Sequence, residues 1–212
     1  MDMDSPASSM DGGLRRRLIG AGMLGLAGAL LPSLASQAGA SAPPDESTTT
    51  TAPPRRPTTD DAAMLAFGRE VELAAVSLYD TALRGDAIPE ELRPTFQFIR
   101  QSHLSYGQSL GALLGQPAPP APLASLVEEY RSAFEVSDIE ELAAAGATLE
   151  NIAVATHTEM LGELVGINGA TLIASILVIE SRNAAVLTNI AGGADLDALL
   201  LNDAEPLTAE KG

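Results

Sequence analysis

The sequence predicts an all-α protein, an antiparallel bundle of four helices with a long crossover between the second and third. The first observation is an internal repeat, in which residues 71–79 (VELAAVSLY) match residues 149–157 (LENIAVATH) 78 positions later. Each copy precedes a second helical segment, where residues 99–103 align with residues 179–183 at a spacing of 80. The second observation is that apolar and polar residues rarely alternate, so strands are not expected.

The first predicted helix starts at Thr59, Asp60 and Asp61, which supply a cap and first-turn acids, and ends near Gly85. The second starts near Pro94, since proline is tolerated in a first turn, and stops at Gly115. Both helices carry a broad apolar face. The short link between them predicts that they lie antiparallel.

A proline-rich crossover of residues 116–123 follows, with a short helix expected over residues 125–134. The third long helix opens with Ser137 and Glu140, which have the spacing of a capping box, and runs to about Val165. A tight turn at residues 166–169 leads to the fourth helix, which runs to about Ile190. The bundle is therefore expected over residues 60–192. The tail, residues 193–212, is expected to form a short helix at 195–201 and then to fray.

The chain before the bundle predicts export. Residues 1–40 have a basic start at Arg15, Arg16 and Arg17, an apolar run, and small residues before position 41. The arginine pair fits a twin-arginine signal, with an ordinary secretory signal as the alternative. Residues 41–59 are rich in proline and threonine and predict an extended linker, either glycosylated or a plain spacer. We expect an extracytoplasmic protein, secreted or held in the cell envelope.

Composition excludes several classes of function. The chain has 12 basic and 28 acidic residues and a formal net charge of −16, without the basic patch that nucleic-acid binding requires. It has no cysteine, which excludes disulfides and a lipoprotein anchor. The apolar run of the signal is too short and too glycine-rich to be a good membrane span, and no stable membrane span is expected after signal removal. A homodimer and a partner in the cell envelope remain open.

Three glutamates lie inside apolar helix sequence: Glu72, Glu150 and Glu180. An ionised carboxylate in a helix that is buried all round must be paired, protonated or bound to a metal. One such residue is readily explained as a helix-edge side chain that reaches solvent. Three of them, two at matching repeat positions, predict an inward-facing cluster.

These motifs resemble the ferritin-like superfamily, and more closely the secreted bacterial ferritin-like domain proteins related to desiccation-associated proteins. The resemblance covers about residues 60–191 and rests on Glu72 followed by Tyr79 and on Glu150 followed by His157. It implies a ferritin-like fold with a di-metal site. In that site two helices each give one Glu, and the other two each give Glu-x-x-His.

The chain departs from this pattern in both Glu-x-x-His motifs, which align with Arg100-Gln101-Ser102-His103 and Glu180-Ser181-Arg182-Asn183. Each motif has lost a different half. The candidate metal ligands that remain are Glu72, His103, Glu150 and Glu180, with Arg100, Asn183, Tyr79 and His157 as neighbours. Arg100 is expected to pair with one of the glutamates in place of a metal.

These departures from the family pattern leave no cofactor or a single divalent ion as the expectation, with iron or manganese suited to the donors. His103 is either a ligand or a hydrogen-bonded core residue, and His157 is expected to pack or to support a ligand. Tyr79 either donates to a carboxylate or simply packs. Three functions stay open: a non-catalytic envelope or stress-related protein with at most one ion, a di-metal oxidase or peroxide-removing enzyme, and a structural module held by buried Arg–carboxylate pairs.

Overall fold

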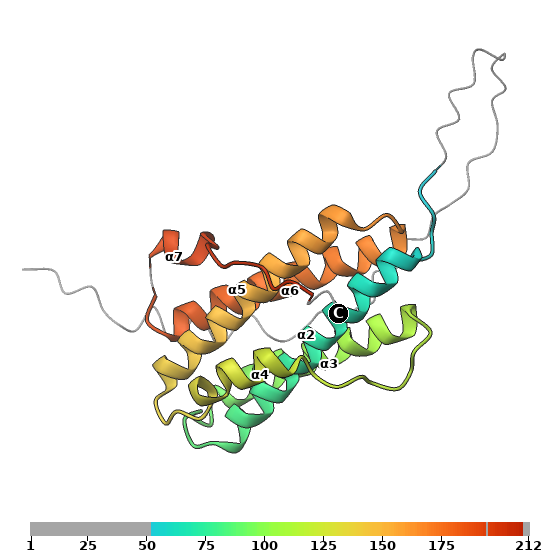
Figure 1. The fold of residues 1–212 in the computed structure, drawn as a ribbon. Coiled ribbons are helices and arrows are strands. Elements are labelled where there is room, and N and C mark those ends of the chain that lie inside the picture. The colour runs from blue at the N-terminus through green and yellow to red at the C-terminus, as the bar shows by residue number, and fades with distance from the viewer. Residues whose placement is uncertain (1–51, 194, 210–212) are drawn as a thin grey trace, which may run out of the picture. The chain divides into compact units, whose positions relative to one another are not determined.

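The computed structural model describes residues 52–193 and 195–209. The predicted export signal and most of the linker lie outside the described residues. The described part is all-helical, as predicted (Figure 1). Its four long helices are α2 (Thr59–Arg84), α3 (Arg93–Leu113), α5 (Ile139–Glu163) and α6 (Ile167–Ile190). Its short helices are α4 (Ala124–Tyr130), the 3-10 turn η1 (Arg131–Phe134) and α7 (Leu196–Leu200).

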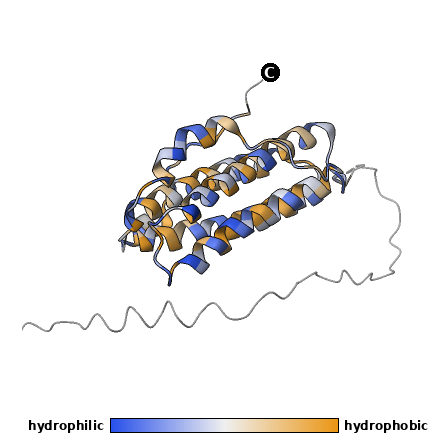
Figure 2. Ribbon diagram, turned by 90° about the horizontal axis from the view of Figure 1, so that it is seen from below, coloured by the Kyte–Doolittle hydropathy of each residue, from blue (hydrophilic) through white to orange (hydrophobic). Residues whose placement is uncertain are grey.

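The long helices form two hairpins, in which α2 packs mainly on α3 and α5 mainly on α6. The crossover between the hairpins contains α4 and η1, and both of these elements contact α2 (Figure 1). Hydrophobic and hydrophilic residues occupy different sides of the helices (Figure 2). This arrangement confirms the predicted helical bundle. Contacts between α2 and α5 are much sparser than those within either hairpin, so a seam separates these two helices.

The apolar core falls into two clusters on either side of a polar layer. The larger cluster surrounds Tyr79, Phe96 and Phe134, and the smaller one includes Leu65, Leu110 and the two buried isoleucines Ile173 and Ile176. Between them lie the buried glutamates and histidines that form the candidate site. Aromatic packing fixes one side of this layer, because the Tyr79 ring stacks on His103 with centroids 5.7 Å apart.

Asp61 ties the start of α2 to the α5–α6 turn. Its carboxylate accepts the Thr58 N–H in a capping box and also the N–H groups of Val165 and Gly166 at 2.9 Å. Burial alone would raise the pKa of Asp61, but these hydrogen bonds outweigh burial and the pKa is lowered. Asp61, which the sequence indicated as a first-turn acid of the first helix, therefore also connects the two hairpins.

The sequence suggested that the C-terminal tail frays after the short helix, but the described part of the tail does not fray after α7. Residues 202–209 run back along α5 instead (Figure 1). Asn202 donates to the Asn151 carbonyl, and the Leu207 N–H donates to the Thr156 hydroxyl. Leu207 packs against the larger core cluster. The tail therefore covers part of the α2–α5 seam.

Helix α6 is the one helix in the described ranges that is long and apolar enough to cross a membrane. A core helix of a soluble bundle satisfies the same criterion, so this finding by itself does not indicate a span. The buried side of α6 faces the polar layer and contributes Glu180 and Asn183 to it.

Candidate metal centre

The site lies in the middle of the bundle, where each long helix contributes side chains to one buried layer. Its six residues are at most 4% exposed, and they are Glu72, His103, Glu150, His157, Glu180 and Asn183. All three glutamates predicted to point inward do so. The internal repeat places Glu72 of α2 and Glu150 of α5 at matching positions on the two hairpins.

His103 bridges two of the carboxylates. Its Nδ1 lies 2.7 Å from Glu72 Oε2, and its Nε2 lies 3.0 Å from Glu150 Oε1. Ionised carboxylates only accept hydrogen bonds, so both ring nitrogens must donate, which makes His103 an imidazolium. Burial alone would lower the pKa of His103, but the charges and hydrogen bonds of Glu150 and Glu72 raise it well above the ordinary value.

Glu150 is fully engaged by protein donors. Tyr79 donates its hydroxyl to Glu150 Oε1 at 2.6 Å, next to His103, and Asn183 donates to Oε2 at 3.2 Å. The pKa of Tyr79 is raised well above its ordinary value, first by burial and then by Glu150. Tyr79 therefore stays protonated and remains a donor. Both oxygens of Glu150 are satisfied without a metal.

The other half of the layer is not fully satisfied. His157 Nδ1 lies 2.9 Å from Glu180 Oε2 and 3.1 Å from Oε1, so this nitrogen donates to Glu180. His157 Nε2 and Glu72 Oε1 have no hydrogen-bond partner among the described residues. These two buried atoms face each other at 3.9 Å, too far for a hydrogen bond.

Ligand atoms of Glu72, His157 and Glu180 lie within 4.8 Å of one another, a grouping that could hold a metal ion. Of the predicted ligands, Glu72 and Glu180 belong to this group, whereas His103 and Glu150 form the hydrogen-bonded half. His157, expected to pack or to support a ligand, lies at the centre of the group. Burial raises the pKa of Glu180. Burial alone would lower the pKa of His157, but the charge and hydrogen bond of Glu180 raise it.

Arg100 does not pair with any of the three glutamates, contrary to expectation. Its guanidinium makes a bidentate ion pair with Asp80, at 2.9 and 3.1 Å, on the outer side of α2 and α3. Both side chains are partly exposed, at 25% and 38%. The α3 residue that pairs with the glutamates is the buried His103, one helical turn further along the helix.

The buried residues of α3 and α6, the second helix of each hairpin, give a different alignment of these two helices from the one based on sequence. Phe96, Ile99, His103 and Leu110 of α3 correspond to Ile173, Ile176, Glu180 and Leu187 of α6, each 77 residues later. His103 therefore occupies the position of Glu180, three residues away from the sequence-based alignment. Tyr106, which the sequence reasoning passed over, occupies the position of Asn183.

Tyr106 is half-buried beside this layer. Burial and the charges of Glu72, Glu180 and Glu150 raise its pKa to about 12. The motif on α3 thus becomes His103-x-x-Tyr106, and the motif on α6 is Glu180-x-x-Asn183. The spacing of three residues shared by both pairs is the sequence signal that could have identified Tyr106.

Charge reversal of Arg100 tests its assignment to the outer surface. We expect Arg100→Glu to lower the free energy of unfolding by about 0.5–1 kcal/mol, because it removes one partly exposed ion pair and places two carboxylates together. We expect no change in bound metal. Urea denaturation and metal analysis measure both, with Arg100→Gln as the neutral control. A gain of metal binding would place residue 100 inside the site and contradict the pairing with Asp80.

Comparison with known proteins gives one match and two negative results. The model of the family described as ferritin-like domain matches residues 60–193, more than half of the chain. The search of curated proteins gave no match. The search of solved structures also gave none. The helical bundle and its layer of buried glutamates agree with the family match. The chain belongs to the ferritin-like domain family.

Proposed function

We propose that this protein is an extracytoplasmic ferritin-like bundle that binds a single divalent metal ion and carries out no di-metal oxygen chemistry. One observation carries the proposal: Glu72 Oε1 and His157 Nε2 are buried, unpartnered and 3.9 Å apart, beside Glu180. Buried polar atoms without partners are costly, and such exceptions call for an explanation. A metal ion held by Glu72 and His157 would supply the missing partner.

The donor set fits such an ion. Metal–nitrogen and metal–oxygen bonds of about 2.0–2.2 Å let one ion reach two atoms about 4 Å apart. Carboxylate and imidazole ligands suit iron, manganese and zinc. Glu180 accepts the N–H on Nδ1 of His157, so in the neutral imidazole Nε2 carries the lone pair that faces Glu72. The raised pKa of His157 favours a proton on Nε2 in the ion-free protein, and a bound ion would take the place of that proton. A carboxylate that orients a ligating histidine in this way is a common support of metal sites.

The half of the layer around Glu150 argues against a second ion. Both oxygens of Glu150 already accept from Tyr79, His103 and Asn183. Three carboxylates with a charged His103 and one divalent ion are electrically neutral. A second divalent ion would require His103 to lose its proton and its hydrogen bonds. We therefore infer that the His103 imidazolium takes the place of a second metal.

An ion bound here would supply a fixed positive charge and Lewis acidity in a site without solvent exposure. Glu72, His157 and Glu180, on helices α2, α5 and α6, would hold that ion. An envelope or stress-related protein that stores or carries one ion fits this closed site. The basic and apolar residues at the N-terminus support export. A twin-arginine route would carry the bundle already folded around its ion.

Metal analysis of protein expressed in iron- and manganese-supplemented medium tests the proposal. We expect about one divalent ion per chain after removal of loosely bound metal with a mild chelator. Two tightly held ions per chain would contradict it and favour the di-metal oxidase. The absence of any bound ion at neutral pH would favour a structural module, for which the hydrogen-bonded half around Glu150 provides a specific observation.

A further inference from the structure

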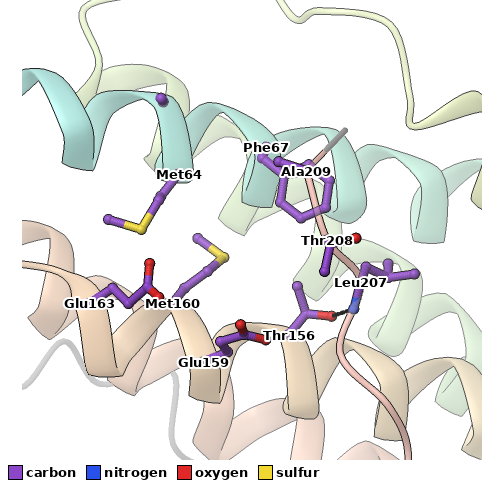
Figure 3. Close-up of a pocket in the computed structure, with 10 residues that line it drawn as sticks. Met64, Phe67, Thr156, Glu159, Met160, Glu163, Leu207, Thr208 and Ala209 are labelled. Atoms are coloured by element: carbon purple, nitrogen blue, oxygen red, sulfur yellow. Dashed lines mark hydrogen bonds between the residues drawn. The ribbon is translucent and has the colours of Figure 1, made fainter. Parts of the chain in front are cut away.

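A groove of about 450 Å³ lies over the seam between α2 and α5, on the side covered by the C-terminal tail. Figure 3 shows Met64 and Phe67 on one helix facing Met160 on the other, with Leu207 of the tail beside them. The hydrogen bond between Leu207 and Thr156 holds the tail against α5. Met160, which lines the groove, and His157 of the candidate metal site both lie against Gly68, so the groove lies next to that site.

Met160 occupies the inner end of the groove. A Cβ placed on Gly68 would lie 2.8 Å from Met160 Cε, 3.3 Å from Met160 Sδ and 3.5 Å from His157 Nε2. The thioether of Met160 and the unpartnered nitrogen of His157 thus approach the same point. Because Gly68 has no side chain, the methyl group of Met160 occupies the space beside His157 Nε2 that a Cβ would need. Met160 lines the groove and is itself only 6% exposed, so it closes the path to His157.

The groove suits a cation on its way to the site. Glu159 and Glu163 of α5 both line it and are exposed, and none of its lining residues is basic. Carboxylates around a concave opening raise the local concentration of cations. The methionine side chain has three rotatable bonds and adapts easily to its surroundings. Rotation of Met160 would connect the acidic rim to His157 Nε2 without movement of a helix.

We propose that this groove is the access route by which a divalent cation reaches Glu72, His157 and Glu180, and that the Met160 side chain is its gate. The inference rests on the proposed single-ion function and adds how the ion enters. A gate changes the rates of uptake and release in the same sense and leaves the affinity unchanged. A ligand changes the affinity itself. The two roles of Met160 therefore differ in a measurable way.

Stopped-flow uptake of Co²⁺, followed by its visible absorbance, tests the gate, and release is followed after addition of excess chelator. We expect Met160→Ala to accelerate both uptake and release by about tenfold or more, with an unchanged dissociation constant. Leu161→Ala is the matched control, because Leu161 follows Met160 on α5 and packs against the same apolar cluster but does not line the groove. We expect its rates to match those of the unmodified protein. Thermal unfolding monitored by circular dichroism checks the fold of each variant.

Met160→Leu is the second variant and conserves the side-chain volume, so it still tests the gate if Met160→Ala folds poorly. Leucine has fewer rotatable bonds than methionine, and we expect uptake and release to slow by about tenfold. Bound Co²⁺ with equal rates in all four proteins would overturn the gate while leaving the single-ion function intact. Loss of affinity in Met160→Ala without faster exchange would also overturn it. If the unmodified protein binds no Co²⁺, the single-ion function fails and the gate fails with it.

Discussion

Replacing His103 by alanine is expected to lower the free energy of unfolding of the ion-free protein by about 3–5 kcal/mol. The change removes the imidazolium that donates to Glu72 Oε2 and Glu150 Oε1. Both carboxylates would then remain buried without a cationic partner. Breaking a buried pair by removing one member costs more than the pair contributes, because the remaining charge stays desolvated.

The pH dependence separates this loss from a simple packing defect. The folded-state pKa of His103 is raised above its ordinary value of 6.5, so its contribution to stability is complete below that value. The contribution is lost as the pH rises through the raised folded-state pKa. Urea denaturation at several pH values measures it, with Ile99→Ala, one turn earlier on α3, as the control. A cost of His103→Ala that stays constant from acid to alkaline pH would contradict an imidazolium at this position.

Metal affinity is expected to depend on one half of the buried layer and not on the other. We expect Glu72→Gln and His157→Leu each to weaken divalent-ion binding by at least about 100-fold, because each removes a proposed ligand. Glu150→Gln should retain binding within about tenfold, since Glu150 touches only protein donors. Competition with a chromogenic chelator measures the affinities at fixed pH. Equal losses in all three variants would indicate a site that extends over both halves.

Most of the fold could be predicted, because the caps and apolar faces of long helices are recognisable in the local sequence. The predicted starts near Thr59 and Pro94 and the stop near Ile190 agree with α2, α3 and α6. The docking of residues 202–209 was not predictable, because that segment has no periodic pattern and is held by individual contacts such as the one from Leu207 to Thr156. Its position depends on a surface that only the folded bundle creates.

The inward-facing glutamates were also predictable, since a repeat within apolar helix sequence marks them. Which residues of α3 face the site could not be predicted, because residues three apart lie on nearly the same helix face. Arg100 and His103 therefore fit the helical periodicity of α3 equally well in the sequence. Only their burial in the structure distinguishes the outer Arg100 from the inner His103. For the same reason Tyr106 went unnoticed three residues further on.

The central position of His157 depends on distances that no sequence pattern encodes. As the counterpart of Tyr79 in the repeat, it was expected to pack or to support a ligand. In the structure Tyr79 donates to Glu150 within one half of the layer, whereas His157 directs Nε2 at Glu72 in the other. The two copies of the repeat have thus taken different roles. This asymmetry is the basis of our proposal of one ion instead of two.

Anomalous X-ray scattering from a crystal of the manganese-loaded protein tests the single-ion account most directly, because it counts and locates bound ions in one measurement. The account predicts one anomalous peak per chain within bonding distance of Glu72 and His157, with Glu180 beside it, and His103 still bridging Glu72 and Glu150. Two peaks, or a single peak bonded to Glu150 in place of His157, would contradict it.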